Sequence, residues 1–338
     1  MRSRGALEAP HKAIIVSQSI LHDLEISEEL VGLRLDQALA IKFPQYSRSQ
    51  IKTWIDAGQV HLNGTVRRPK HPVVLKDQVE MTATLDASAD IEPQAVDFSV
   101  VYSDEDLIVV DKPAGCVVHP GAGNKDGTLA NGLIHRYAEL ESLPRAGLVH
   151  RLDKETSGLL LVARNHNSYQ LLTSMMANRD ISRSYIALCN GIIISGGTID
   201  EPIGRDPNNR LKMKIKRDGR KAISHYRVTE KYRSHTLCEV TLETGRTHQI
   251  RVHMTHLGHP IVGDKRYGGR LVLPSKPLDE FRDALSQLDR HVLHAKALAF
   301  VHPITGEQIS AQSPTPQTLT RILQLAKQDQ LYGAAERS

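Results

Sequence analysis

Arg151 and Asp153 stand two positions apart in a charged cluster that comes directly before an apolar strand, in the segment PRAGLVHRLDKETSGLLLVAR (144–164). An arginine beside a carboxyl group lowers the pKa of that group. A carboxylate that stays ionised at neutral pH suits a nucleophile or a general base, whereas a general acid needs a raised pKa. Asp153 is therefore a candidate nucleophile or base. A surface ion pair uses the same residue types, so both interpretations stay open on these residues alone.

Four histidines lie within a dozen residues of the C-terminal half: His248, His253, His256 and His259. Zinc hydrolases of the helical type need histidines four residues apart with an adjacent glutamate, but the steps here are five, three and three. No carboxylate lies between Arg246 and Gly263. The segment predicts no metal site. Its arginines, Arg246 and Arg251, are better suited to binding phosphate or a carboxylate.

The glycines do not form a nucleotide fingerprint. Gly121 and Gly123 give a GxG, but the next glycine, Gly127, falls one position late for a dinucleotide site, and there is no P-loop. The stretch HPGAGN (119–124) could offer backbone N–H groups to a phosphate, or it could be a plain turn. We expect no nucleotide cofactor.

The N-terminal part predicts a small helix–helix–hairpin unit. Leu35, Ala38, Leu39 and Phe43 have the spacing of one helical face. Ser47 and Gln50 form a capping box for a second helix. The dipeptide Asn63-Gly64 favours a tight hairpin turn. Exposed cations would lie on the second helix and after the hairpin: Arg48, Lys52, Arg67 and Arg68.

That segment, LRLDQALAIKFPQYSRSQIKTWIDAGQVHLNG (33–64), resembles the S-four RNA-binding domain, which is named after a ribosomal protein. The resemblance implies binding to structured RNA and no particular chemistry. We place this domain at 31–85, after an N-terminal tail and extension at 1–30, and we expect a polar linker at 86–99.

The remaining chain predicts an α+β domain at 100–328 with a mixed, mostly antiparallel sheet, followed by a C-terminal tail at 329–338. The expected strands outnumber the helices and do not alternate regularly with them, which argues against a doubly wound parallel sheet. Strands are expected at 106–113, 158–164, 183–189, 222–231, 235–243 and 294–301. Helices are expected near 168–178, 247–257 and 315–327.

Composition and charge limit the function classes. Of 338 residues, 40% are hydrophobic and 24% charged, which is typical of a globular protein and excludes a fibrous or wholly disordered chain. No apolar run approaches the ~20 residues of a membrane span, so we expect a cytoplasmic protein. The net charge is only +5, but basic residues concentrate at 33–80 and 201–270 around an acidic middle. Two basic surfaces are typical of a protein that binds a polyanion.

The segment HRLDKETSGLLLVAR (150–164) resembles the signature of the RluA/RsuA-type pseudouridine synthases. Three further segments agree with that family in order and spacing: DLIVVDKPAGCVVHPGAG (106–123), RSYIAL (183–188) and LETGRTHQIRVHMTHLGHPIVGD (242–264). Local details such as PQYSRSQIK, HPGAGN and PRAGLVHRLDKET are most similar to the group that modifies 23S (large-subunit) ribosomal RNA. For that group the resemblance implies uridines of the helix-69 stem-loop.

The resemblance also implies roles for individual residues. Asp153 would attack the ribose or remove its 2′ proton, and the sequence does not separate the two. Tyr185 would stack under the uracil and could also take its carbon-5 proton. Arg246 would be the basic partner of Asp153, with Arg251 as the second choice. Arg151 would fill the space left by the flipped base. The residues expected to contact RNA are Arg151, Arg48, Lys52, Arg67, Arg68, His119 and Arg251.

This isomerisation gains and loses no electrons, so the resemblance implies no redox cofactor and no metal. The expected partner is 23S ribosomal RNA or a large-subunit precursor particle, and the expected state is a monomer without membrane contact. Two alternatives stay open. One is a catalytically silent RNA-binding or ribosome-assembly factor of the same fold, and the other is a metal-dependent hydrolase built on the histidines.

Overall fold

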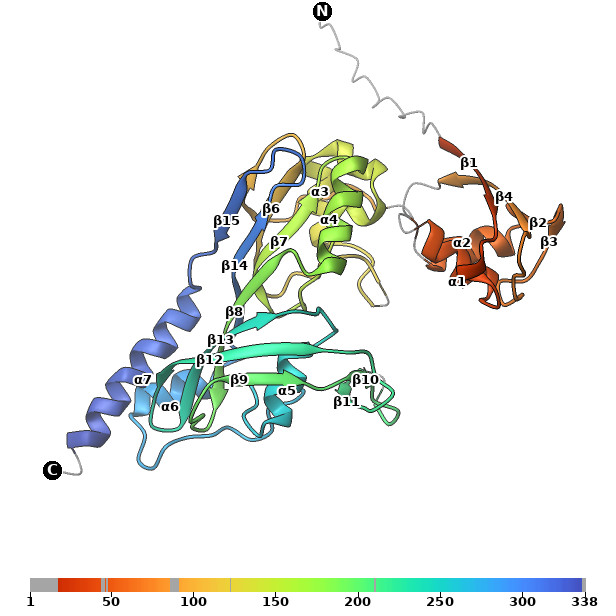
Figure 1. The fold of residues 1–338 in the computed structure, drawn as a ribbon. Helices are drawn as coiled ribbons and strands as arrows, with labels where there is room; N and C mark the ends of the chain where they lie inside the picture. Colours follow the sequence, from red (N-terminus) through yellow and green to blue (C-terminus); the bar gives the residue numbers. More distant parts are fainter. Residues whose placement is uncertain are drawn as a thin grey trace, which may run out of the picture. The chain divides into compact units, whose positions relative to one another are not determined.

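The structure of the protein is a computed structural model that describes residues 18–43, 46, 48–85, 91–121, 123–209 and 211–335. The chain divides into two compact units, Met1–Ala89 and Asp90–Ser338 (Figure 1). Each unit has its own buried apolar core. Within the described residues, no helix is both long enough and apolar enough to cross a bilayer.

In the N-terminal unit, two helices pack against a four-stranded sheet. The helices are α1 (Leu35–Lys42) and α2 (Arg48–Asp56), and the strands in sheet order are β1 (Gln18–Glu25), β4 (Gln78–Leu85), β2 (Val60–Leu62) and β3 (Thr65–Val66). The expected hairpin turn is confirmed, because Asn63 and Gly64 have φ angles of 52° and 69° and join β2 to β3. The predicted cap Ser47 lies outside the described residues.

The predicted start of the first domain at residue 31 is wrong, because residues 18–30 of the expected tail and extension belong to the N-terminal unit. β1 pairs antiparallel with β4 along its whole length, and Leu30 in the 3₁₀ turn that follows (Glu28–Leu30) is buried. β1 is an edge strand, and its Leu21 is 70% exposed. An apolar residue on the solvent side weakens the period-two pattern that marks a strand in the sequence.

A nine-stranded sheet runs through the second unit, and it is mixed and mostly antiparallel, as expected. Its strands in order are β5 (Ser99–Ser103), β6 (Leu107–Lys112), β7 (Ser157–Ala163), β14 (Leu293–Val301), β8 (Ser182–Asn190), β13 (His235–Leu242), β12 (Ile223–Lys231) and β9 (Gly197–Asp200), with β15 (Gln308–Gln312) paired to β14. Among the described strands, β7 and β14 form the parallel pair, and they meet at Ser157 and Gly158.

Strand β7 is apolar along its length because both of its faces are covered. Leu160 and Val162 lie in the core that contains α3 (Leu129–Arg136), whereas Leu159 and Leu161 lie in the core beside α4 (His166–Asn178). The loop that precedes β7, which carries Asp153, is therefore anchored at one end in the centre of the unit.

The predicted linker 86–99 is wrong for its second half, which packs on α3. Ile91 is buried, the Asn131 side chain donates a hydrogen bond to the carbonyl of Glu92, and the backbone N–H of Gln94 donates to the carbonyl of Asn131. The backbone N–H of Gly127 also donates to Oε1 of Gln94, at 2.7 Å, and residues 91–98 lie outside the sheet. A segment held by such separate side-chain contacts has no periodic pattern that a sequence could reveal.

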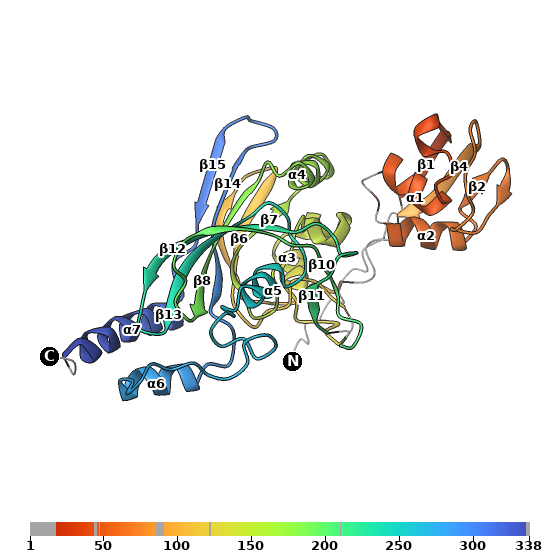
Figure 2. The ribbon, with the colours of Figure 1, turned by 60° about the horizontal axis from the view of Figure 1, so that its bottom comes forward.

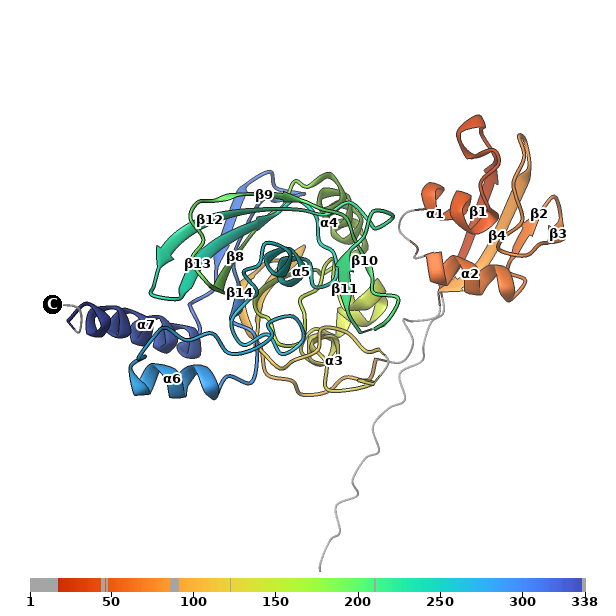
Figure 3. The same ribbon diagram turned by 90° about the horizontal axis from the view of Figure 1, so that it is seen from below.

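The predicted boundary at 328 is also wrong, because α7 (Gln317–Ala335) continues past it. Asp329, which the sequence suggests is exposed, is only 1% exposed. Its buried charge is balanced by an ion pair with Arg233. Helix α7 lies beside α6 (Asp279–Ser286), and Figures 2 and 3 show the two together at one end of the sheet. A separate two-stranded hairpin, β10 (Ile203–Arg205) and β11 (Met213–Ile215), lies beside α5 (Gln249–His256).

Candidate active site

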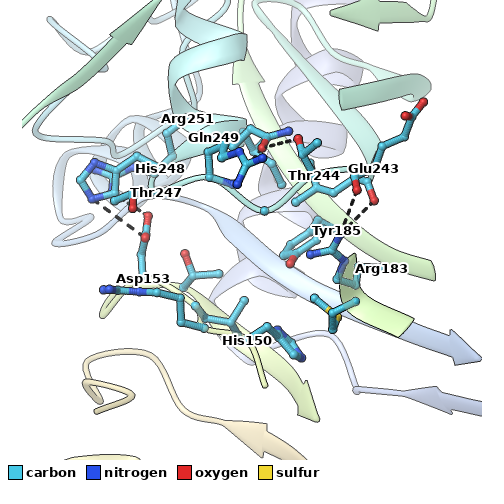
Figure 4. A pocket seen from close by; sticks show the side chains of 18 of the residues that line it. His150, Asp153, Arg183, Tyr185, Glu243, Thr244, Thr247, His248, Gln249 and Arg251 are labelled. Carbon is cyan, nitrogen blue, oxygen red and sulfur yellow. Dashed lines mark hydrogen bonds and ion pairs between the residues drawn. The ribbon is translucent and has the colours of Figure 1, made fainter. Parts of the chain in front are cut away.

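A cavity of about 570 Å³ opens between the loop before β7, strand β8 and the segment that leads into α5 (Figure 4). Asp153 enters it from the loop, Tyr185 from β8, and His248 and Arg251 from the start of α5. The cavity therefore collects residues that are almost a hundred positions apart in the chain.

Backbone hydrogen bonds position the Asp153 loop from behind. Lys112 is fully buried, and its ammonium donates to the carbonyls of Pro113, Cys116 and Lys154 at 2.8, 2.9 and 3.1 Å. Burial lowers the pKa of Lys112 to about 8. At neutral pH its ammonium therefore still donates to all three carbonyls, one of which belongs to the residue after Asp153.

Two neutral histidines hold the other end of this loop. Nε2 of His291 lies 2.7 Å from the Thr156 hydroxyl, and Nδ1 of His294 lies 2.9 Å from the Ser157 hydroxyl. Burial lowers the pKa of His291 to about 4 and also lowers that of His294. Both rings can therefore bond the hydroxyl groups without adding charge beside Asp153.

Asp153 is paired with Arg251, and the prediction that Arg246 takes this place is wrong. Nη1 of Arg251 lies 2.9 Å from Oδ2 of Asp153, while its Nε and Nη2 donate to the carboxylate of Asp264 at 2.7 and 3.0 Å. Burial alone would raise the pKa of Asp264, but the bonds and charge of Arg251 lower it on balance. Arg246 donates from Nε to the carbonyl of Lys221 instead.

His248 and Tyr185 complete the surroundings of the carboxylate. Nε2 of His248 lies 3.9 Å from Oδ1 of Asp153, and Figure 4 shows the two side chains facing each other. Tyr185 is 6% exposed, and burial raises the pKa of its phenol. The site thus offers one carboxylate, one neutral imidazole and a protonated phenol around a single space.

The comparisons with known proteins agree with this geometry. The RNA pseudouridylate synthase family matches residues 106–256, and the S4 domain matches residues 33–79. A protein of Xanthomonas campestris, named ribosomal large subunit pseudouridine synthase D, is 45% identical over 316 residues, which cover 94% of this chain and 96% of that protein. The proteins of the same name from Escherichia coli K12 and Pseudomonas aeruginosa are each 44% identical, over 93% of this chain and 97% and 98% of their own.

The chain belongs to the RNA pseudouridylate synthase family. Among solved structures, human RNA pseudouridylate synthase domain containing 4 is similar with a TM-score of 0.54 and 25% identity, over 68% of this chain and 93% of that one. Human RNA pseudouridylate synthase domain containing 1 has a TM-score of 0.51 and 27% identity, over 70% and 97%. The family assignment made from the sequence is confirmed.

Of the three residues of the catalytic unit that were predicted to contact RNA, one is exposed at the cavity and two are not suited to that role or lie outside the cavity. Arg151 is exposed and lines the cavity, so it remains a candidate RNA contact. Arg251 is not suited to that role, because its side chain is 8% exposed and already bonded to two carboxylates. His119 does not line the cavity; its Nδ1 lies 3.0 Å from the carbonyl of Pro120, and burial lowers its pKa.

In the S4 domain of the synthase, Lys52, Arg67 and Arg68 are exposed. Arg48 is instead held by two hydrogen bonds to Asp36, at 2.8 and 3.0 Å, and Arg34 binds the same carboxylate. Asp36 is 2% exposed, so it needs these partners. Arg48 is therefore a structural residue as well as a surface cation.

The sequence analysis named three of the arginines of this cavity and missed the other three, Arg145, Arg179 and Arg183. In all, six arginines line it, against the two carboxylates of Asp153 and Glu243: Arg145, Arg151, Arg179, Arg183, Arg246 and Arg251. Arg183 is 4% exposed, has no carboxylate partner among the described ion pairs, and leaves its buried Nε without a hydrogen-bond partner. It is two residues from Tyr185 on β8, so the alternation of the strand already places both on one face.

Three of the four clustered histidines are bonded to hydroxyl or carbonyl groups. Nδ1 of His248 lies 2.8 Å from the Tyr267 hydroxyl, that of His253 lies 2.9 Å from the Ser224 hydroxyl, and that of His259 lies 2.9 Å from the carbonyl of Asn190. Among the described residues, the group whose side chains could share an ion is Asp104, Asp106 and His302. Its members are already bonded, with Asp104 accepting two backbone N–H groups and His302 lying 3.1 Å from it.

Proposed function

We propose that this synthase converts uridines of large-subunit ribosomal RNA to pseudouridine, with Asp153 acting at the ribose and the helix-69 stem-loop as the target. The observation that carries this proposal is the Asp153 carboxylate, held by Arg251 in an arginine-lined cavity opposite a buried Tyr185. The names of the bacterial relatives, each over nine-tenths of this chain, support the large ribosomal subunit as substrate.

The reaction breaks the bond between N1 of uracil and C1′ of ribose and forms a bond between C5 and C1′. The C5 proton leaves and N1 gains a proton, so atoms and charge balance without an oxidant. Asp153 either bonds to C1′ or removes the 2′ proton. Both routes need a carboxylate oriented toward the sugar, and the bond from Arg251 supplies that orientation while leaving Oδ1 directed to the cavity.

Tyr185 holds the base while it turns. A phenol whose pKa is raised by burial keeps its proton at neutral pH, so we assign it to contact with the uracil face rather than to accepting the C5 proton. Arg183 lies next to it with an unpartnered buried N–H. Its Nη2 donates to the carbonyls of Leu242 and Glu243 at 3.3 and 3.4 Å, but among the described ion pairs no carboxylate balances its charge. We assign Arg183 to a phosphate or carbonyl oxygen of the bound nucleotide, because a buried cation needs a partner that balances its charge.

The target uridine must leave its stem or loop before Asp153 can reach the sugar, and flipping costs a few kcal/mol. Arg151 is exposed at the cavity, so it can stack in the space left by the base and pair with phosphate at the same time. Four arginines of the cavity have no carboxylate partner among the described ion pairs: Arg145, Arg151, Arg183 and Arg246. Together with the exposed cations of the S4 domain, they would supply the affinity for the RNA backbone.

The test is to map pseudouridine after incubating the protein with three substrates: a large-subunit RNA transcript, immature large-subunit particles and a small-subunit RNA transcript. We expect modification in the helix-69 stem-loop of the first or second and none in the third. Modification confined to the small-subunit RNA would contradict the proposal. Tight binding with no modification of any substrate would favour the silent assembly factor.

A further inference from the structure

The hairpin β10–β11 stands apart from the main sheet but is bonded to the turn at 264–267 (Figure 3). The backbone N–H of Met213 donates to the Tyr267 hydroxyl at 2.9 Å, and Nη1 of Arg266 donates to the carbonyl of Leu211 at 2.8 Å. These two hydrogen bonds connect the hairpin directly to this turn.

The same turn holds both groups that face Asp153. The Asp264 carboxylate binds Arg251 and also accepts the backbone N–H groups of Arg266 and Tyr267, at 2.9 and 3.0 Å. The Tyr267 hydroxyl lies 2.8 Å from Nδ1 of His248. Arg251 and His248, the neighbours of the catalytic carboxylate, are thus both hydrogen-bonded to residues of the segment 264–267.

The backbone N–H of Met213 fixes which atoms carry hydrogens in the series Met213, Tyr267, His248. A backbone N–H can only donate, so the Tyr267 oxygen accepts from Met213 and its own O–H is available to Nδ1 of His248. Burial raises the pKa of Tyr267 and lowers that of His248, so the phenol keeps its proton and the imidazole is neutral. The remaining ring proton is then on Nε2, the atom that faces Asp153.

The ring of Tyr267 also lies between two cations. The Arg251 guanidinium is 5.0 Å from its centroid, and the ammonium of Lys212, on the hairpin, is 5.9 Å away. Tyr267 therefore connects the hairpin to Arg251 through its ring as well as to His248 through its hydroxyl.

The hairpin presents basic side chains to solvent and is held by a small apolar interface. Lys214 is 44% exposed and has a weak surface contact with Asp206 at 3.8 Å, which a phosphate can replace. The cluster under the hairpin consists of three buried side chains and three partly buried ones: Ile203, Ala222, Val252, Met213, Ile215 and Tyr267.

We propose that the hairpin β10–β11 senses bound RNA, and that Tyr267 and His248 are positioning residues that couple its contact with RNA to the orientation of Asp153. This inference rests on the proposed function, because it concerns the same carboxylate. RNA phosphates that contact Lys214 would seat the hairpin, and the seated hairpin would hold the two neighbours of Asp153 in place for reaction. RNA bound without this contact would leave Asp153 less well oriented.

The test measures the single-turnover rate at saturating RNA and the RNA concentration that gives half of it. Tyr267→Phe keeps the ring and removes the two hydroxyl contacts. We expect it to lower the saturating rate about tenfold and to change the half-saturating concentration less than twofold. Tyr102→Phe is the matched control, because it removes a hydroxyl bonded to Asp104 outside the cavity, and it should leave both quantities unchanged.

A double variant tests the coupling itself. Lys214→Ala should lower both the rate and the affinity in the wild-type background, but only the affinity in the Tyr267→Phe background. Asparagine tolerates the positive φ of position 248, so His248→Asn is a suitable variant. Adding Tyr267→Phe to His248→Asn should not lower the saturating rate below that of His248→Asn alone. A Tyr267→Phe protein that reacts at the wild-type rate, or effects that multiply independently, would overturn the inference. A wild-type protein that forms no pseudouridine would instead overturn the proposed function.

Discussion

Nη1 of Arg251 lies 2.9 Å from Oδ2 of Asp153, although the two residues are 98 positions apart in the chain. The other side of the same guanidinium is bound by Asp264. A guanidinium is a planar fork that can bind two carboxylates at once, and an ammonium cannot replace it. This shared arginine sets the direction in which the Asp153 carboxylate points.

Arg251→Lys should therefore lower the single-turnover rate about a hundredfold with a much smaller change in RNA affinity, because the point charge cannot bridge Asp153 and Asp264. Arg246→Gln should mainly affect RNA binding, because Arg246 lines the cavity but bonds a backbone carbonyl and not Asp153. We expect weaker RNA binding and a nearly normal rate at saturating RNA. If Arg246→Gln reacted much more slowly at saturating RNA than Arg251→Lys, Arg246 and not Arg251 would be the functional partner of Asp153.

Lys112→Met should destabilise the protein by about 2–4 kcal/mol, because three carbonyls lose their donor in a site without solvent. It should also slow the reaction, since one of these carbonyls belongs to Lys154, beside Asp153. Lys154→Met is the control: its side chain is exposed and its carbonyl is unchanged, so its stability should stay within ~0.5 kcal/mol of the wild type. Equal unfolding midpoints for the two variants in urea would contradict this account.

Acid should reduce stability partly through Asp264. Burial opposes ionisation of this group, but Arg251 holds its folded-state pKa below the ordinary value, which is ~3.9 in an unfolded chain. The stabilisation is therefore complete above about pH 4 and is lost as the pH falls toward the folded-state pKa. Asp264→Asn should be less stable by about 3–5 kcal/mol at pH 7. Thermal unfolding should show this difference narrowing as the pH falls below about 4 toward the lowered folded-state pKa, and a constant difference would show that Asp264 is not the titrating group.

The basic residues of the S4 domain should fall into two classes. Arg67 and Arg68 are exposed, so replacing both by alanine should weaken RNA binding and reduce the slope of log affinity against log salt by roughly 0.7–0.9 for each phosphate that the variant no longer neutralises. Arg48→Ala should instead lower the stability of the domain by about 1–2 kcal/mol, because the buried Asp36 loses one of two partners. Unchanged salt dependence in the double variant would remove these arginines from the RNA surface.

Local patterns predicted much of this fold. The apolar run of β7, the turn at Asn63-Gly64 and the strands β8, β12, β13 and β14 lie within a residue or two of their expected places. Each has a signal in its own residues: apolar side chains on both faces, positive φ, or β-branched alternation. The family motifs likewise placed Asp153 and Tyr185 in one cavity.

The errors come from contacts between distant residues. Arg246 and Arg251 are equally plausible partners of Asp153 in the sequence. Only the position of Asp264, 13 residues after Arg251, decides between them, because it binds the guanidinium from the far side. Asp329 resembles a tail residue until Arg233 pairs with it. Buried charges are the positions where a sequence pattern misleads most, since their partners are not neighbours in the chain.

The most direct test of the account uses RNA that carries tritium at carbon-5 of uridine, with the release of label to water followed in the presence of a metal chelator. Wild-type protein, Asp153→Asn and Asp153→Glu are compared at saturating RNA. The account predicts release by the wild type at an undiminished rate in chelator, none above background by Asp153→Asn, and unchanged RNA binding by that variant. Release by Asp153→Asn at the wild-type rate, or a wild-type rate that needs added metal, would contradict the central claim that the Asp153 carboxylate carries the reaction.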